Sequence, residues 1–423
     1  MKTHSIIFMS MLMAALAMTS CSKDDSPKQE GIPAEKTYTD SNGLKLTYEG
    51  APMPGKSMTF IRDEKAPSHA QLVMGSVVNF PVVALSNGET VTPNPIPGPG
   101  VIPGSPKETL SLSLSQSGDA DTFSGTADSR FCTYAYKGFV SADGLTLDIS
   151  DVKLKDTRIC GAWGLPAYTV NESTHLVTDT PIHLVWDSSA QIDFNGKPLT
   201  IDGLLQMIMA MPLFQNHTMR LPDLLTLMVK QVRFGQDGNI TATYVDMSGK
   251  TPALKNTAPN LLQYVLADDS NLLLYPNYNV GLKAAADLIN KINEEMMASL
   301  TRSGATGGTT GGTPSPLDAL KILEGILAQL TPMLADGLPL TYNLQGNRLD
   351  VYLDSRTLLP IMKNVLLPLL EDKQLMNSLL DVLGADPDLA DLVKILPSVI
   401  EAADEIIAGT TRLEVGLRLV KAG

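Results

Sequence analysis

Several short segments of this chain alternate strictly between apolar and polar residues. They are Leu44–Tyr48, Leu110–Leu114, Leu145–Ile149 and, near the C-terminus, Leu413–Leu419. A period of two places one set of side chains on a single face of a β-strand. Asn42-Gly43, Asn87-Gly88 and Asp143-Gly144 supply the positive φ angles that tight hairpin turns require. The pattern therefore predicts mainly antiparallel β-structure.

Helical periodicity enters only in the second half of the chain. Leucines recur at three- and four-residue steps in Leu320–Leu334, and further helices are expected at Leu358–Leu370 and Ser398–Ala408. The sequence thus predicts an α+β fold. An all-β domain at 37–175, an antiparallel sandwich or barrel, precedes an α+β domain at 176–423, an antiparallel sheet with helical insertions.

Two segments are dense in glycine with proline or threonine. Thr92–Pro106 (TPNPIPGPGVIPGSP) cannot be a central strand, because proline donates no hydrogen bond to a ladder. We expect it to form a long exposed loop. Residues 301–316 (TRSGATGGTTGGTPSP) predict a flexible Gly/Thr linker inside the second domain.

The N-terminus combines one basic residue, Lys2, with an apolar segment at Ile6–Met18. This segment is too short to span a bilayer, which takes about 20 apolar residues. Small residues precede Cys21, so residues 1–21 resemble a bacterial lipoprotein signal with Cys21 as the lipidated residue. The polar residues 22–36 are then expected to be a tether between the membrane and the first domain.

Ser22–Asp25 (SKDD), directly after Cys21, looks like the surface-export signal of lipoproteins from Bacteroides-type bacteria. With strand-turn-strand segments such as Val232–Ile240, the chain resembles uncharacterised lipoproteins of these bacteria, some with calycin-like (lipocalin-like) barrels. The resemblance implies a surface-exposed protein, lipid-anchored in the outer membrane. It implies no activity and no site residues.

Net charge and aromatic content disfavour two classes of binding partner, nucleic acids and glycans. The formal net charge of −13 disfavours nucleic acid, which binds to basic surfaces. Aromatic residues make up only 5% of the chain, and Trp163 and Trp186 are the sole tryptophans. Because glycan platforms usually stack sugar rings on exposed aromatic rings, this scarcity counts against a dedicated glycan binder.

Cys132 and Cys160 are the two cysteines that remain if Cys21 is acylated. In an oxidising compartment they could form a disulfide, or they could stay as two buried free thiols. The separation of the two residues in the fold decides between these alternatives.

The sequence contains no motif typical of serine hydrolases, metalloproteases or nucleotide-binding proteins. The four histidines beyond the signal are His69, His175, His183 and His217, and none has the spacing of a metal motif. Asp119 and Asp121 lack the further ligands of a calcium loop, which has Gly where this chain has Ser124. We therefore predict no catalytic residue, no metal and no cofactor, and expect a protein that is not an enzyme.

Leu204–Leu213 (LLQMIMAMPL) is rich in methionine, whose side chain adapts to irregular apolar surfaces. It could roof an apolar pocket or form a helix packed on the sheet. The expected function is non-catalytic binding of a small or apolar ligand. The alternatives are glycan capture through an exposed Trp163 or Trp186, and a structural or adhesive surface component. The ligand-binding residues and the oligomeric state stay open.

Overall fold

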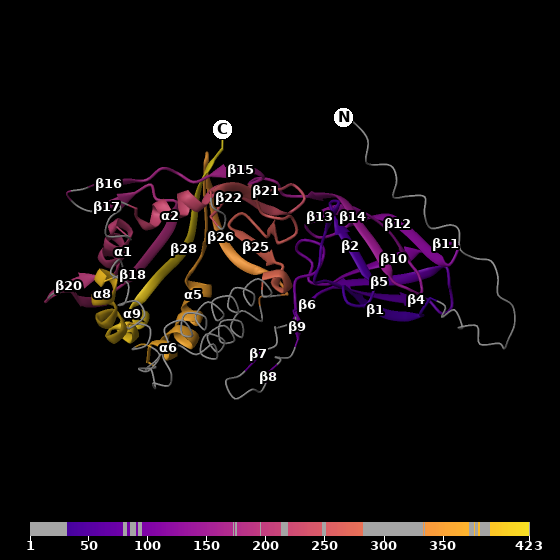
Figure 1. Ribbon diagram of the computed structural model, residues 1–423, viewed down its shortest axis with the longest axis horizontal. Helices are drawn as coiled ribbons and strands as arrows, with labels where there is room; N and C mark the ends of the chain where they lie inside the picture. The colour runs from indigo at the N-terminus through magenta and orange to yellow at the C-terminus, as the bar shows by residue number, and fades with distance from the viewer. Residues whose placement is uncertain are drawn as a thin grey trace.

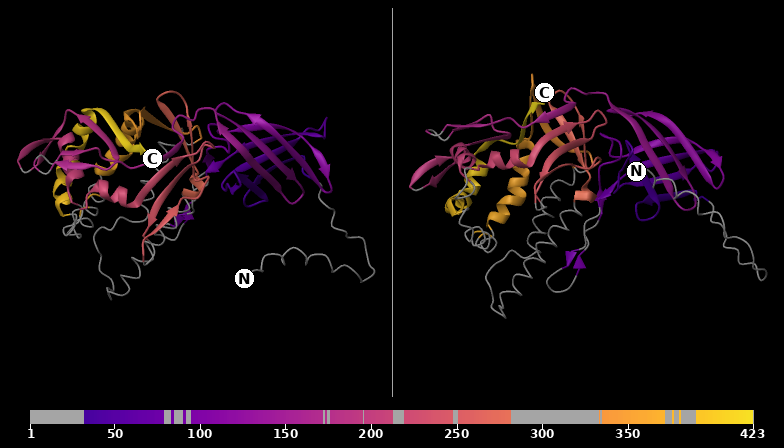
Figure 2. Two further views of the ribbon diagram at one scale, coloured as in Figure 1. Left: turned by 90° about the horizontal axis from the view of Figure 1, so that it is seen from above. Right: turned by 45° about the horizontal axis from the view of Figure 1, so that its top comes forward.

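The computed structural model describes residues 32–78, 83–84, 90–91, 95–171, 173, 176–194, 196–212, 219–247, 251–281, 333, 335–371, 376, 380 and 390–422. Figures 1 and 2 show two β-rich halves side by side, with helices gathered on the C-terminal half. The predicted α+β class is confirmed, and its N-terminal part is all-β.

Two sheets form the N-terminal half. The first has the order β1 (Glu35–Thr39), β4 (Ser57–Arg62), β5 (His69–Gly75) and β10 (Glu108–Ser113). The second has the order β11 (Ser115–Ser117), β12 (Ala120–Asp128), β13 (Cys132–Val140), β14 (Leu145–Leu154), β2 (Leu44–Tyr48) and β3 (Ala51–Pro52). β1 begins inside the predicted tether, at residue 35 of 22–36.

The predicted alternation sets the packing of these sheets. Leu44, Leu46 and Tyr48 are buried, while Lys45 between them is exposed. Rows of the same kind from both sheets form one apolar core, which makes this half a sandwich. Both sheets are open in the described residues, so the barrel alternative for this domain was wrong.

The three predicted turns have different outcomes. Asp143-Gly144 joins the antiparallel strands β13 and β14, as expected for a hairpin. Asn42-Gly43 does not close a hairpin, because β1 and β2 lie in different sheets and β2 pairs in parallel with β14. Gly43 has φ of 104°, and its carbonyl accepts from Leu145 N, so this turn packs against the other. Asn87-Gly88 lies outside the described residues.

A ten-stranded antiparallel sheet organises the C-terminal half. Its order is β23 (Ala253–Asn256), β22 (Ile240–Asp246), β21 (Val229–Phe234), β15 (Gly161–Gly164), β28 (Thr410–Lys421), β27 (Arg348–Leu353), β26 (Leu338–Gln345), β25 (Asn271–Pro276) and β24 (Leu262–Leu266), with β18 (Ile182–Ser188) also paired to β28. One side of β28 carries β27, and the other carries β18 and then β15.

Helices and small hairpins complete this half. The helices are α1 (Ile201–Ala210), α2 (Leu221–Met228), α5 (Ser355–Ile361), the π-helix η1 (Met362–Leu366), α6 (Leu367–Glu371), α8 (Ala390–Glu401) and α9 (Ala403–Ala408). The two-stranded sheets are β16 (Thr169–Asn171) with β17 (Leu176–Thr178), and β19 (Gln191–Phe194) with β20 (Lys197–Thr200). In the N-terminal half β6 (Val77–Val78) pairs β9 (Ile96–Pro97), and β7 (Val83–Ala84) pairs β8 (Thr90–Val91). The predicted helices at Leu358–Leu370 and Ser398–Ala408 are confirmed, whereas Leu320–Leu334 and the 301–316 linker lie almost wholly outside the described residues.

The two halves share one apolar core. A single cluster of buried residues runs from Tyr38 in the sandwich to Leu419 in β28. β15, on the N-terminal side of the predicted boundary at 175/176, pairs with β21 and β28 of the C-terminal sheet. The two halves therefore pack against each other through one continuous core.

Three asparagine side chains bind the sandwich to the C-terminal half. The Asn260 amide donates to the carbonyls of Tyr48, Ala51 and Pro52 at 3.1–3.3 Å. Asn277 donates to Pro54 O at 2.9 Å, and Asn279 donates to Gly55 O at 2.8 Å. These bonds reach carbonyls at the β2–β3 hairpin and in the segment that follows it, and they fix the orientation of the halves.

The expectation of a long exposed loop at Thr92–Pro106 was wrong for its central part. Gly98–Pro103 is buried, and Val101 and Ile102 belong to the shared core. Lys56 Nζ donates to the carbonyls of Pro99 and Gly100, both at 2.8 Å, which satisfies backbone groups that water cannot reach. Ile96–Pro97 pairs with β6 in a two-stranded sheet, whereas Gly98–Pro103 joins no strand and is nevertheless buried.

Lys56 gives the stability of the protein a pH dependence. Burial lowers the pKa of Lys56 to about 7, whereas an unfolded lysine titrates near 10.4. Between these values the unfolded chain binds the extra proton, so the free energy of unfolding rises with pH, by up to about 1.4 kcal/mol per unit. We expect Lys56→Met to flatten this rise in denaturant titrations at pH 6.5, 8 and 9.5.

Lys45→Met is the matched control, because Lys45 is exposed on β2. Its unfolding curves should follow those of the wild type at every pH. Equal pH dependence in the Lys56 variant and the wild type would show that the amine is not buried in the folded state.

Candidate functional site

The strands around β28 present two chemically different faces. Cross-strand partners share a face, so Leu184, Val415 and Leu353 project from one side of β18, β28 and β27. Their same-face neighbours are also apolar: Ile182, Trp186, Leu413, Leu417, Leu419, Leu349, Val351, Tyr342 and Leu344. We call this surface the apolar face.

The sheet curls so that the apolar face lies inside. Phe234 of β21 and Tyr264 of β24 both project from this face, and their rings meet edge to face at 5.1 Å. An isolated bridge between Asn239 and Gln263 joins the same two regions of the sheet. Two distant parts of one sheet can meet in this way only if the face between them is concave.

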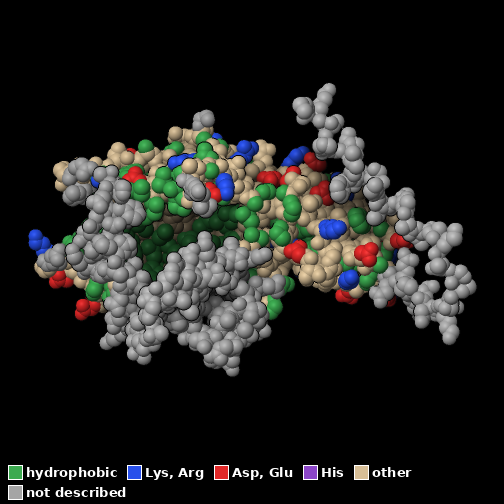
Figure 3. All heavy atoms as spheres, viewed as in Figure 1, with side chains coloured by type: hydrophobic (Ala, Val, Ile, Leu, Met, Phe, Trp, Pro, Cys, Tyr) green, Lys and Arg blue, Asp and Glu red, His purple; other side chains and the backbone are tan. Residues whose placement is uncertain are grey.

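A hollow opens in the middle of the apolar face. Val415 is 41% exposed although its strand is paired on both sides. Its cross-strand partners Leu184 and Leu353 are themselves only half-buried. Figure 3 shows a recess lined by hydrophobic side chains in this half of the molecule. An exposed aliphatic side chain with half-buried neighbours is unusual on a strand that is paired on both sides, because such side chains normally form the core.

Packed residues close the hollow at both ends of β28. Leu419 is buried in the core that the C-terminal sheet shares with the sandwich. Leu413 is buried at the other end, where α5 packs against β28. Ser355 Oγ, in the first turn of α5, accepts from Leu413 N at 2.7 Å and holds the helix there.

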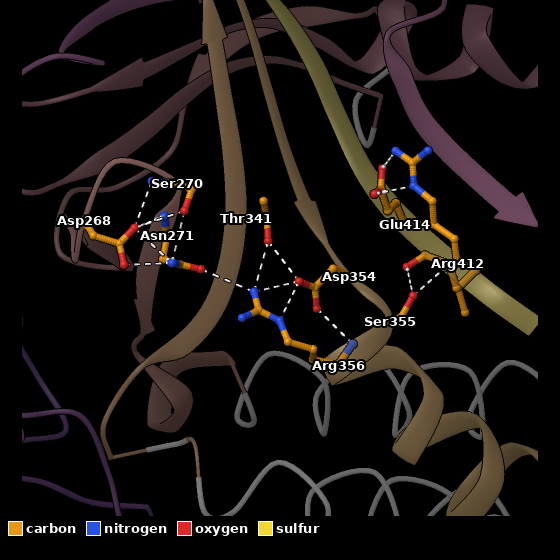
Figure 4. A network of polar contacts seen from close by, with 10 residues as sticks. Asp268, Ser270, Asn271, Thr341, Asp354, Ser355, Arg356, Arg412 and Glu414 are labelled. Atoms are coloured by element: carbon orange, nitrogen blue, oxygen red, sulfur yellow. Dashed lines mark hydrogen bonds and ion pairs between the residues drawn. The ribbon is translucent and has the colours of Figure 1, made fainter.

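A polar network fixes the start of α5, as Figure 4 shows. Asp354 caps the helix by accepting from Arg356 N at 3.0 Å. Thr341 donates to Asp354 at 3.0 Å, and Arg356 reaches Asn271 Oδ1 at 3.3 Å. The helix that closes one end of the hollow is thereby attached to β25 and β26.

The opposite face of the same strands carries a buried charged cluster. His183 Nε2 lies 2.7 Å from Glu414 Oε2, and Arg412 donates twice to Glu414 at 2.7 and 3.0 Å. Asp350 accepts from Arg348 at 2.8 Å and from Arg418 at 3.0 Å. This convex-face cluster joins β18, β27 and β28 through side chains.

Gly416 lets two rings of this cluster meet. His183 and Tyr352 are its cross-strand partners, and their rings stack over it with centroids 4.3 Å apart. A Cβ at residue 416 would lie 2.6 Å from Tyr352 Cβ, so only glycine fits.

The arginines decide the charge of the two carboxyls. Burial alone would raise the pKa of Asp350, but hydrogen bonds from Arg348 and Arg418 outweigh burial and hold the pKa below its usual range. Burial likewise opposes ionisation of Glu414, and bonds from Arg412 and His183 keep its pKa lowered. Both groups are therefore charged at neutral pH, and the cluster is a structural ion-pair network.

The structure resolves the alternatives for the methionine-rich segment. Residues 201–210 form α1, which packs on β17 and β18, and Leu204 and Met209 are buried. This is the packed helix of the simpler interpretation. Residue 213 and its neighbours up to 218 lie outside the described residues.

Neither tryptophan forms an exposed platform. Trp163 is 1% exposed in the shared core and donates to Ile159 O at 2.8 Å. Trp186 is partly buried against Ile192 and Ile406, and its indole N–H donates to Thr410 at 2.9 Å. A glycan site centred on either indole would need these contacts to break.

The two cysteines are free thiols in the structure. Cys132 Sγ lies 3.3 Å from Ser129 Oγ, whereas Cys160 Sγ lies 3.1 Å from Tyr264 Oη. Burial raises the pKa of both thiols, which disfavours the reactive thiolate. Cys132 is buried, whereas Cys160 is only partly buried.

The remaining candidates do not come together in a site. His183 joins the convex-face cluster, while His69 is exposed on β5. Asp121 pairs with Arg62, and Asp119 lies on the exposed β11–β12 turn. Cys21, His175 and His217 lie outside the described residues. Within the described ranges, no group of three His, Cys, Asp or Glu side chains could hold a metal ion.

Sequence reasoning missed both the hollow and the convex-face cluster. The sequence of β28 contained a signal for the cluster. Arg412, Glu414 and Arg418 occupy the polar positions of this alternating strand. A central strand with charges on one face needs partners for them on its neighbours. In β27 the corresponding signal was Asp350, a charged residue within the otherwise mostly apolar segment Leu349–Leu353.

Removing the charge of Asp350 should destabilise the protein at neutral pH. Asp350→Asn removes the carboxylate to which Arg348 and Arg418 donate, at a cost of about 1.5–3 kcal/mol. Because the folded pKa of Asp350 is lowered, the difference from the wild type is present above about pH 4 and shrinks as the pH falls further. Urea unfolding at pH 7 and pH 3 measures it, with Asp119→Asn as the exposed control.

Comparison with known proteins adds no relative to this description. No protein-family model, no curated protein and no solved structure matches the chain. None of the helices in the described ranges combines the length and hydrophobicity needed to cross a lipid bilayer.

Proposed function

We propose that the protein is a non-catalytic binding protein for an apolar ligand, held in the hollow of the C-terminal sheet. The exposure of Val415 at the centre of the concave apolar face carries this proposal. Water covering such a row is unfavourable by about 25 cal/mol for each Å² of apolar surface. An apolar molecule seated between β18, β27 and β28 removes that surface from water.

The lining of the hollow indicates the chemistry of the ligand. The cross-strand neighbours of Val415 are aliphatic, and the charged residues nearest to it on the same strands, Arg412, Glu414, Arg418 and Asp350, project from the opposite face. The site therefore suits a chain of methylene groups, such as the acyl chain of a lipid. A charged or strongly polar headgroup would lie at the mouth, in contact with water.

A lipid-anchored, surface-exposed location in the outer membrane is part of this proposal. Cys21 with the small residues before it supports the anchor, and SKDD at residues 22–25 supports export to the surface. Such a location would place the hollow close to a source of acyl chains. Metabolic labelling with a radioactive fatty acid, with Cys21→Ser as the comparison, tests the anchor separately from the hollow.

Filling the hollow should abolish ligand binding. Val415→Trp adds an indole at the centre of the apolar face, and we expect at least a tenfold loss of affinity for a fluorescent fatty acid. Native mass spectrometry of the wild type should also show bound acyl lipid from the expression host. Fluorescence titration of both proteins gives the affinities.

Leu254→Trp is the control, because Leu254 is exposed on the edge strand β23, away from the hollow. It should bind the fatty acid as the wild type does. Absence of any bound lipid together with no response to the probe would contradict the proposal, as would undiminished binding by a folded Val415→Trp protein.

A further inference from the structure

We infer that the outer face of the six-stranded sheet of the sandwich binds a neutral glycan. This site is separate from the hollow, lies in the other half of the molecule and depends on different residues. We call it the outer face. It is made by the exposed positions of β12, β13 and β14.

Alternation along these strands separates the outer face from the core. Phe123, Tyr134 and Ile149 point inward, whereas Ser124, Lys137 and Asp148 lie on the outer face. The register brings the outer residues into rows across the sheet. One row is Ser115–Thr122–Phe139–Thr146–Lys45, and the next is Ser124–Lys137–Asp148–Thr47.

Phe139 is the exception among these polar rows. It lies on the central strand β13 and is 42% exposed, with hydroxyl groups of Thr122 and Thr146 on either side. A single aromatic ring set among hydroxyls is poorly suited to a protein interface, whose centre is apolar and depleted in charge. It suits a sugar ring, which presents an apolar C–H face to the ring and hydroxyls to its sides.

Donors and acceptors for sugar hydroxyls lie beside the ring. Asp148 accepts from Thr47 at 2.6 Å and lies 3.4 Å from Lys137 Nζ. The Lys137 side chain is 72% exposed, so its ammonium can donate to a ligand while it also pairs with Asp148. Threonine and serine hydroxyls both donate and accept, which matches the hydroxyls of a sugar.

The shape of the outer face leaves room for more than one sugar. A recess of about 630 Å³ surrounds Phe139, and a second recess of about 530 Å³ lies beside Thr126 and Ala135. The pairs Ser124–Lys137 and Thr126–Ala135 are consecutive on this face, so the two recesses follow one another along β12 and β13. An extended oligosaccharide fits such a track better than a single monosaccharide.

Charge on the outer face favours an uncharged glycan. Its lysines and aspartates balance: Lys45, Lys137 and Lys153 against Asp128, Asp148 and Asp151. An anionic polysaccharide would require an excess of lysine or arginine. The aspartates would repel it, so a neutral polymer is the better match.

Affinity electrophoresis tests the inference. The mature protein is run in native gels that contain starch, mannan, xyloglucan or a mixed-linkage β-glucan, and in gels with alginate. We expect at least one neutral polymer to retard the wild type and alginate not to. Phe139→Ala should weaken that retardation at least tenfold in apparent affinity, and Thr122→Val should weaken it less.

Leu176→Ala removes an equally exposed apolar side chain from β17, in the other half, and should leave retardation unchanged. Val415→Trp should also be retarded normally, which separates this inference from the apolar-ligand proposal. Failure of every neutral polymer to retard the wild type would overturn the inference. So would retardation by alginate alone, or equal retardation of a folded Phe139→Ala protein.

Discussion

The pairing of β28 is the constraint on which the C-terminal half depends. This strand of 12 residues is the last in the sequence, yet it binds β27 on one side and both β18 and β15 on the other. It therefore joins segments more than 200 residues apart. The two faces of β28 differ in polarity. Leucines and Val415 lie on the concave side, and Arg412, Glu414 and Arg418 lie on the convex side.

The side-chain period of a strand could be predicted from sequence, whereas its partners could not. Leu413–Leu419 alternates cleanly, and the structure confirms a strand there. Nothing in that segment indicates that Gly416 would lie between His183 and Tyr352, because the neighbouring strands are distant in sequence. The same holds for β2, whose alternation is local but whose parallel pairing with β14 is not.

The prediction that the irregular segment Thr92–Pro106 is exposed was partly wrong for a related physical reason. The proline and glycine of Gly98–Pro103 correctly excluded a strand, but exposure depends on what lies opposite. Lys56 lies opposite and supplies the donors that the buried carbonyls need. In the same way, the amides of Asn260 and Asn277 donate to Tyr48 O at the end of β2 and to Pro54 O after β3, in the other half. Such partners are set by tertiary structure and leave no local periodicity.

The hollow could not be predicted, because Val415 has the same place in the pattern as the buried Leu413 and Leu419. Full burial of an aliphatic side chain is worth about 1.5–3 kcal/mol. A row of half-buried side chains around Val415 thus forgoes several kcal/mol, a large part of a typical net stability of about 5–15 kcal/mol. Other contacts offset this loss, including the shared core, the asparagine amides and the convex-face ion pairs. A ligand that covers the row recovers the missing burial, so occupancy of the hollow and stability of the fold are thermodynamically linked.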